Sequence, residues 1–285
     1  RWSNAQPLVQ HGRARTVALG HNGNLTNSGE LRAALASERI ALGTTSDTEV
    51  LLTALDQWGP SALDRCEGMW AFAVYDEREG SLLLSRDRFG EKPLHLYRDA
   101  TGLYFGSEPK LVFALLGRRL PVDLDQARRF LVNGYKALYK ERGRTFFQGL
   151  CELPPATSLT VDALGRESTS TYWEPRCDPD PEMSYEEAVA GARERLIRAV
   201  RLRLRADVPL AFCMSGGVDS NALISVAKNV CGYDVHGFTI QNTDARYEEQ
   251  DLVEHAVTRL AIRHTSIPLE TRDFLPKLRV LVRQH

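Results

Sequence analysis

The sequence predicts a chain of two domains, an α+β first half followed by an α/β second half built on a Rossmann-like parallel sheet. Three observations lead to this prediction. Strand patterns separated by turn residues dominate residues 1–175. Strand and helix patterns alternate over residues 184–285, which favours parallel strands joined by helices. Residues 176–183 are rich in Pro and Asp and lack periodicity, so we interpret them as the linker.

Composition limits the possible classes of protein. The chain has 285 residues, of which 43% are hydrophobic and 26% charged, as is typical of globular proteins. A formal net charge of -1 gives no reason to expect a nucleic-acid partner. No apolar run approaches the roughly 18 residues that a membrane helix needs. The five cysteines form no Cys-x-x-Cys pair, which argues against zinc and disulfides and favours a cytoplasmic location.

The first half is expected to begin with a short strand over residues 17–21. Asn27 with Glu30 predicts the cap of a helix that ends near Ala36, and Ser46-Asp-Thr-Glu49 predicts a capping box that opens a second helix. Turn residues then separate further strands expected at 69–75, 82–86, 94–97 and 103–105.

The second half is expected to alternate regularly. The predicted order is a helix over 184–205, a strand over 208–214, a helix over 220–230, a strand over 235–241, a helix over 247–261, a strand over 264–269 and a helix from 273 to 285. That final helix has no cap signal, and three strands are few for a nucleotide-binding sheet. We therefore expect further residues of the same protein beyond both ends of the chain.

The most informative stretch is Ser215-Gly216-Gly217-Val218-Asp219-Ser220, between a predicted strand and a predicted helix. Such a loop directs backbone N–H groups and the positive end of a helix dipole at one point, which suits a phosphate. The serine hydroxyls add donors, and the aspartate is a candidate magnesium ligand. No Gly-Lys-Ser/Thr follows, so this is not a Walker A loop. A plain glycine-rich turn is the alternative.

This loop resembles the pyrophosphate loop of ATP pyrophosphatases, which cleave ATP between its α and β phosphates. The first half carries a second ordered set of motifs: His21–Asn24, Ser46–Glu49, Glu67–Asp76, Ser85–Leu94 and Gly106–Lys110. This set resembles the glutaminase domain of class II amidotransferases. Its last two motifs are similar to the glutamine-hydrolysing asparagine synthetases in particular. Residues 22–27 are more similar to the amidophosphoribosyltransferases, but among these relatives only the asparagine synthetases join this domain to a Ser-Gly-Gly loop.

The resemblance implies layered antiparallel sheets with helices for residues 1–175 and an ATP-pyrophosphatase domain for residues 184–285. It implies that Asn22 and Gly23 form an oxyanion hole for glutamine hydrolysis. It also implies that Asp47 binds the glutamine α-amino group. Asn24 is a further glutamine-binding candidate, although asparagine synthetases carry Glu there. From the residues alone, a hairpin turn at Asn22-Gly23 and a dipole-stabilising role for Asp47 stay open.

In the second half the resemblance implies that ATP contacts residues 215–220 and the backbone at Cys213 and Ile240, with magnesium on Asp219. Core packing is the alternative for Cys213 and Ile240. Residue 221 is often a second Ser in this family and is Asn here. The segment 241–249 follows a strand end, where either ligand contacts or a solvated loop are expected. For Asp87, Arg88 and Lys92 a solvated charged loop stays open, and we assign them no catalytic role.

The implied activity is that of a glutamine-dependent asparagine synthetase. Glutamine hydrolysis supplies ammonia, Mg-ATP adenylates aspartate or another small carboxylate, and ammonia displaces AMP. The family nucleophile is an N-terminal cysteine, and no cysteine precedes Asn22 here, so we expect the chain to lack its start. The alternatives are amidation of a sugar uronic acid in surface-polysaccharide synthesis and a non-catalytic pseudo-glutaminase scaffold. A homodimer stays open.

Overall fold

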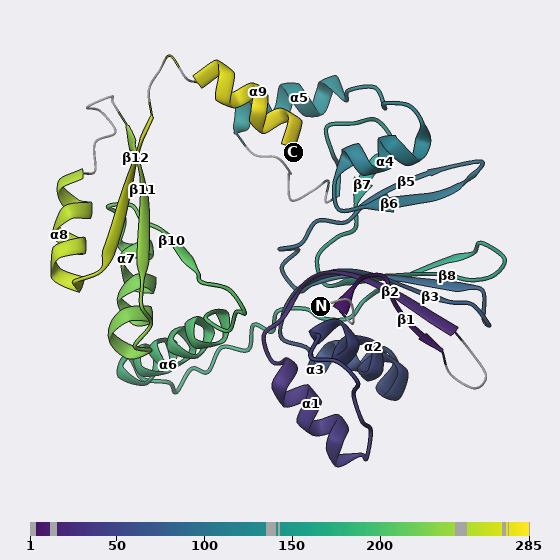
Figure 1. Ribbon diagram of the computed structural model, residues 1–285, viewed down its shortest axis with the longest axis horizontal. Coiled ribbons are helices and arrows are strands. Elements are labelled where there is room, and N and C mark those ends of the chain that lie inside the picture. Colours follow the sequence, from purple (N-terminus) through teal and green to yellow (C-terminus); the bar gives the residue numbers. More distant parts are fainter. Residues whose placement is uncertain are drawn as a thin grey trace. The chain divides into compact units, whose positions relative to one another are not determined.

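The computed structural model describes residues 4–11, 16–134, 141, 143–242, 250–269, 272 and 274–284 (Figure 1). The chain forms two compact units, unit 1 (Arg1–Cys177) and unit 2 (Asp178–His285). The division falls inside the stretch rich in Pro and Asp. Each unit has its own hydrophobic core.

Unit 1 contains two antiparallel sheets. The first is six-stranded, in the order β1 (Leu8–His11), β2 (Thr16–Leu25), β3 (Gly68–Asp76), β4 (Ser81–Arg86), β8 (Thr157–Val161) and β9 (Glu167–Thr171). The second is three-stranded, in the order β6 (Gly102–Gly106), β5 (His95–Asp99) and β7 (Leu150–Glu152). Strand β1 covers only the residues of β2 from Thr16 to Leu19, so the rest of that edge of β2 is not paired with β1.

Successive side chains of a strand point to opposite faces of its sheet, so each sheet can pack on both faces. Unit 1 accordingly has four layers, in the order helices, sheet, sheet, helices (Figure 1). Trp70 and Phe72 of β3 belong to a core shared with α1 (Ser28–Ser37), α2 (Asp47–Trp58) and α3 (Ala62–Arg65). Ala71, between them in sequence, faces the second sheet in a separate core. A third core joins the second sheet to α4 (Pro109–Leu116). The remaining helical elements of unit 1 are η2 (Gly59–Ser61) and α5 (Leu124–Asn133).

The structure corrects the hairpin interpretation of Asn22-Gly23. The strand expected at 17–21 continues to Leu25, and Asn22 pairs with Ala71 inside the β2–β3 ladder. The sequence also did not predict several elements, namely β1, α3, α4, α5, β7, β8 and β9. Most of them are short or lack a regular apolar period, which makes them hard to recognise from sequence.

The two predicted helix caps are only partly correct. The Ser46 hydroxyl accepts from the Thr48 N–H at 3.1 Å, as expected of an N-cap. Glu49 does not complete a capping box, because its carboxylate instead accepts from the N–H groups of Gly43 and Thr44 at 2.8 and 2.7 Å. Asn27 precedes α1 without a side-chain cap, since its amide bonds the backbone of residues 65 and 67. The side chains of Glu49 and Asn27 therefore stabilise neighbouring loops and do not cap the helices.

Unit 2 confirms a parallel sheet with helices, in the strand order β10 (Ala211–Cys213), β11 (His236–Asn242) and β12 (Arg263–Leu269). Its helices are α6 (Tyr185–Arg203), α7 (Val218–Ser225) with its π-helical continuation η3 (Val226–Val230), α8 (Gln250–Leu260) and α9 (Phe274–Gln284). A capping box between Ser184 and Glu187 starts α6. Six buried residues form the core under the sheet: Met214, Ile224, Ala227, Val235, Val253 and Ile262.

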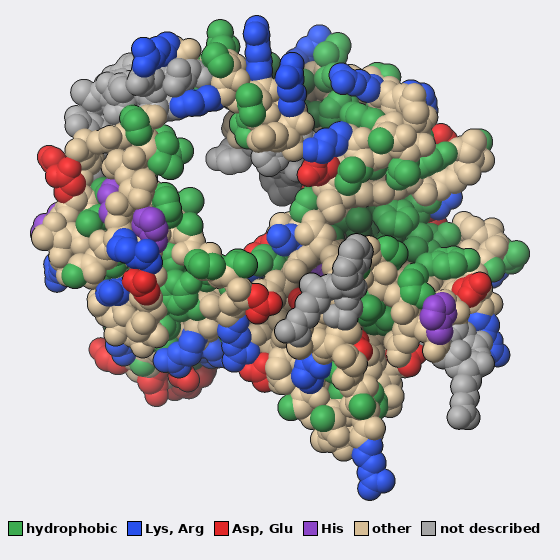
Figure 2. Space-filling model, viewed as in Figure 1, with side chains coloured by type: hydrophobic (Ala, Val, Ile, Leu, Met, Phe, Trp, Pro, Cys, Tyr) green, Lys and Arg blue, Asp and Glu red, His purple; other side chains and the backbone are tan. Residues whose placement is uncertain are grey.

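Among the described residues, no helix has both the length and the apolar character needed to cross a bilayer. Acidic and basic side chains both occur on the visible face of each unit (Figure 2).

Candidate functional site

In unit 1 three of the four candidate residues, Asn22, Gly23 and Asn24, lie on the part of β2 that extends beyond β1. Backbone N–H groups at alternate positions of a strand point to the same side. The His21 N–H donates to Gln6 Oε1 at 2.6 Å, and the Leu25 N–H donates to Asp47 Oδ2 at 3.0 Å. The N–H of Gly23 lies between these two and points the same way, toward the edge of β2 that β1 leaves uncovered. Gly23 therefore presents a backbone donor at a strand edge.

The close approach of β2 and β3 requires a glycine at position 23. A Cβ built on it would lie 2.2 Å from the Met69 carbonyl oxygen and 2.8 Å from His21 Nε2. Real side chains do not tolerate such distances, so β2 and β3 approach this closely only because residue 23 has no side chain.

Asn22 presents its side chain to the other face of the sheet. Its Nδ2 donates to Ser107 Oγ at 3.1 Å, across 85 residues of sequence. Asn22 is exposed and Asn24 is half-buried. The amide of Asn22 and the N–H of Gly23 thus belong to consecutive residues. An oxyanion hole requires such donors to be directed at one oxygen atom.

Asp47 lies at the first position of α2, beside the end of β2. Its bond to the Leu25 N–H joins the helix N-terminus to the strand. This contact uses one carboxylate oxygen structurally, a role that the sequence did not indicate. Asp47 is half-buried, and it lies near enough to His21 to oppose the lowering of the histidine pKa.

His21 is a buried titratable residue that the sequence did not single out as a candidate. Its Nδ1 lies 3.2 Å from Thr48 Oγ1, while its buried Nε2 has no hydrogen-bond partner among the described residues. Burial lowers the pKa of His21, Asp47 raises it in part, and Lys92 lowers it further. The imidazole ring packs against Gly23, so protonation of His21 would place a charge next to the strand that carries the candidate donors.

The loop after β4 is not the solvated charged loop that the sequence suggested. Asp87 is fully buried, and its carboxylate accepts from four backbone N–H groups, those of Trp70, Phe89, Glu91 and Lys92. Arg86 is also buried and donates to the carbonyl oxygens of Gly90, Lys92 and Leu153. Buried and exposed charged residues cannot be distinguished from the sequence alone, because both occur as charged residues in a predicted turn.

In unit 2 the glycine loop connects β10 to α7, as the sequence predicted. The Ser215 and Ser220 hydroxyls lie 2.9 Å apart, and the Gly217 N–H donates to Ser215 Oγ at 3.2 Å. Gly217 precedes α7 without a side-chain cap, which leaves the first turn of the helix suited to an anion. Asp219 is exposed in that turn, in a position suited to a magnesium ion bound with phosphates.

The side chain of Asn221 closes this loop from within the helix. Its Nδ2 donates to the carbonyl oxygens of Ser215 and Gly217 at 3.1 and 2.8 Å. Its Oδ1 is buried and has no hydrogen-bond partner among the described residues.

A cavity of about 480 Å³ opens at the carboxyl ends of the three parallel strands. Cys213, Ser215 and Ile240 line it, whereas residues 216–220 form the adjoining loop and helix turn. Ile240 is 68% exposed and Cys213 is also exposed, so core packing does not explain either residue. A cavity of this size at this edge is typical of a small-molecule site.

Sequence reasoning missed most of the polar wall of this cavity. Thr239 Oγ1 donates to the Met214 carbonyl at 3.0 Å and lies 3.0 Å from His264 Nε2. Gln241 Nε2 donates to Gln250 Oε1 at 2.8 Å. Of these residues the sequence pointed only to Gln241, as the first residue of the segment 241–249. Thr239 and His264 lie within predicted strands, and nothing in the sequence distinguishes them from other strand residues. Of the segment 241–249, the side chain of residue 242 and residues 243–249 lie outside the described part of the chain.

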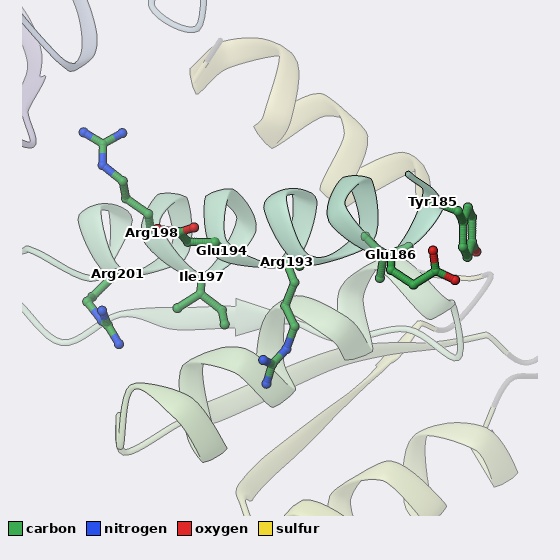
Figure 3. Close-up of a pocket in the computed structure, with 9 residues that line it drawn as sticks. Tyr185, Glu186, Arg193, Glu194, Ile197, Arg198 and Arg201 are labelled. Atoms are coloured by element: carbon green, nitrogen blue, oxygen red, sulfur yellow. The ribbon is translucent and has the colours of Figure 1, made fainter. Parts of the chain in front are cut away.

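A larger hollow, of about 680 Å³, runs along α6 (Figure 3). All its described lining residues belong to that helix, and they include Glu186, Glu194, Arg193, Arg198 and Arg201. It contains no part of the glycine loop, so its size does not make it the nucleotide site. Among the described residues, no group of three or more His, Cys, Asp or Glu side chains could hold a metal ion unaided.

Each of the two units matches the model of a known protein family. The family model of the glutamine amidotransferase domain matches residues 2–173, and that of asparagine synthase matches residues 191–284. The chain is 32% identical over 222 residues to "Asparagine synthetase [glutamine-hydrolyzing] 3" of Bacillus subtilis, covering 78% of this chain and 35% of that protein. It is 27% identical to "Putative asparagine synthetase [glutamine-hydrolyzing] 2" of Methanocaldococcus jannaschii, covering 90% and 49%. It is also 32% identical to "Amidase chyE" of Penicillium rubens, covering 80% and 33%.

These matches define a glutamine amidotransferase domain joined to an asparagine synthase domain. The chain belongs to the glutamine-hydrolysing asparagine synthetase family. It spans between a third and a half of the length of the curated relatives described here, 33% to 49%.

Proposed function

We propose that the protein is a glutamine-dependent, ATP-dependent amide-forming ligase that uses aspartate as its acceptor. Glutamine is hydrolysed at unit 1, and a carboxylate is activated by ATP at unit 2. Activation is needed because a carboxylate is a poor acyl donor. The products are an amide, glutamate, AMP and pyrophosphate.

The observation that carries this proposal is the pair of donors at Asn22 and Gly23. One is a side-chain amide and the other an N–H at an uncovered strand edge. Such donors stabilise the oxyanion of a tetrahedral intermediate and are each worth roughly 100- to 1,000-fold in turnover. Asp47, which begins α2 beside the end of the same strand, would bind the amino group of glutamine, with Asn24 a further contact.

The glycine loop supports a reaction that releases pyrophosphate. Residues 215–220 would bind the β and γ phosphates, and the cavity lined by Cys213 and Ile240 would receive adenine and ribose. Asp219 would hold magnesium, which when bound neutralises charge on the phosphates. A Walker loop, in contrast, serves transfer of the γ-phosphoryl group.

The test is product analysis with the complete gene product. Incubation with glutamine, Mg-ATP and aspartate should give AMP, pyrophosphate and asparagine, with glutamate formed from glutamine. ADP as the product would contradict the mechanism. Adding ammonium salt in place of glutamine separates the two reactions, because it bypasses unit 1.

The acceptor is tested by substitution. A sugar uronic acid that supports AMP formation when aspartate does not would leave the mechanism in place and change the substrate. Loss of both reactions in the complete protein would favour the non-catalytic scaffold.

A further inference from the structure

We propose that Ser107 is a positioning residue for glutamine hydrolysis, and that it acts by holding the side-chain amide of Asn22. This inference rests on the function proposed above. It starts from the 3.1 Å bond between Asn22 Nδ2 and Ser107 Oγ, which joins β2 of the six-stranded sheet to the residue that follows β6 of the three-stranded sheet.

Asn22 needs such a partner because its side chain is exposed on a strand. The terminal torsion of an asparagine amide has a broad rotational preference, so an unsupported amide samples many orientations. Donation to Ser107 uses one of the two N–H bonds of the amide and leaves the second for a ligand. The bond thereby sets the direction of the remaining donor before glutamine binds, which is the preorganisation that an oxyanion hole depends on.

Ser107 is itself held by a buried network. It follows β6 directly, and its carbonyl oxygen lies 3.2 Å from Nδ1 of His95, which is buried on the neighbouring strand β5. Because a carbonyl oxygen only accepts, Nδ1 carries the hydrogen in this contact. The other ring nitrogen, Nε2, lies 3.3 Å from Glu152 Oε1.

Glu152 connects this network to the loop after β4. Its Oε2 lies 3.2 Å from Arg86 Nη1, and both side chains are largely shielded from water. Arg86 is held in turn by the backbone carbonyls of its own loop. The backbone at Ser107 is therefore held by a side chain that belongs to a buried network, while its hydroxyl contacts Asn22. A fixed backbone whose hydroxyl holds a neighbouring amide is the arrangement expected of a positioning residue.

The experiment measures steady-state glutamine hydrolysis by the complete gene product. Ser107→Ala should lower kcat about three- to tenfold, the effect expected for loss of one neutral hydrogen bond, with KM changed less than twofold. Ser107→Thr keeps the hydroxyl and should restore kcat to within about twofold of the wild type. Ser158→Ala is the matched control, since Ser158 is a buried serine of unit 1 whose hydroxyl bonds Ser85 Oγ at 3.1 Å. It should leave kcat unchanged.

A double-mutant cycle separates positioning from general structural support. If Ser107 acts through Asn22, then Ser107→Ala should cost nothing further in a protein that already carries Asn22→Ala. An equal loss of kcat in both backgrounds would overturn the inference, as would a Ser107→Ala variant that is as active as the wild type.

The same cycle distinguishes failure of this inference from failure of the proposed function. A large loss in Asn22→Ala with no loss in Ser107→Ala refutes only the role of Ser107. Wild-type kcat in Asn22→Ala refutes the oxyanion role of Asn22, and the role of Ser107 with it. The melting temperature of each variant, measured by thermal denaturation, tests whether a change in kcat is caused by a change in folding.

Discussion

The side-chain amide of Asn221 donates to the carbonyl oxygen of Gly217 at 2.8 Å, so a residue inside helix α7 holds the residue that precedes that helix. The same amide bonds the carbonyl of Ser215 at 3.1 Å. These two bonds fix the curvature of the loop that we propose binds the ATP phosphates. A loop that is already curved has less conformational entropy to lose when ATP binds.

Asn221→Ala should therefore weaken ATP binding more than it weakens folding. Loss of the two loop bonds should raise the Kd for Mg-ATP about three- to tenfold, which corresponds to losing preorganisation worth about one typical hydrogen bond, roughly 0.5–1.5 kcal/mol. The free energy of unfolding should change by less than about 1 kcal/mol, since the variant also removes a buried acceptor without a partner. Calorimetric titration and chemical denaturation measure the two quantities. Asn229→Ala, which removes an exposed amide from the same helical segment, should change neither.

Asp219→Ala should abolish magnesium-dependent ATP binding, because it removes the carboxylate proposed to hold the ion. Asp251→Ala is the matched control. Asp251 is also exposed in the first turn of a helix, so both substitutions lose a similar interaction with a helix dipole, about 0.3–1 kcal/mol. Calorimetric titration with ATP in the presence and absence of magnesium measures the difference. Equal affinities in the two variants would remove Asp219 from the magnesium site.

Gly23→Ala should disrupt the glutaminase unit through its backbone. The new methyl group would lie 2.2 Å from the Met69 carbonyl oxygen, so β2 and β3 must separate, at a cost of about 1–3 kcal/mol. Gly20→Ala, in the same strand, meets nothing within 4 Å and should be neutral or slightly stabilising. Thermal denaturation and glutamine hydrolysis measure both effects. Similar melting temperatures for the two variants would show that the strands separate freely.

His21 should make unit 1 less stable in mild acid. Burial lowers its pKa in the folded protein, below the ordinary value near 6.5 that it regains on unfolding. As pH falls below about 6.5 the unfolded chain binds a proton that the folded chain does not, so the stability present at neutral pH is progressively lost.

The measurement for His21 is the free energy of unfolding at pH 7 and at pH 5.5. This window lies above the range in which carboxylates with lowered pKa values, such as Glu49, become protonated. His21→Asn keeps an amide to face Thr48 and does not titrate, so it should lose less stability than the wild type between the two pH values. An identical loss in both proteins would show that other groups cause it.

The sequence alone identified the domain family of each unit. The Ser-Gly-Gly-Val-Asp-Ser loop between a strand and a helix, and the alternation that follows it, are local patterns, and the structure has the parallel sheet they predict. The motifs of unit 1 indicated a class II glutaminase domain, and the loop of unit 2 decided for the asparagine synthetases among its relatives. Local signals of this kind depend on residues close together in the chain, which is why they can be read without a fold.

Only the tertiary structure decided what surrounds those motifs. It placed Asn22-Gly23 inside a strand rather than a turn, because the partner strand β3 is more than 40 residues away in the chain. It buried Asp87 and Arg86, which a sequence presents as ordinary surface charges. It also brought Ser107 to Asn22 and Asn221 to Gly217. Burial and hydrogen bonding between distant residues depend on how the layers stack, and no periodic pattern along the chain encodes which side chains then meet.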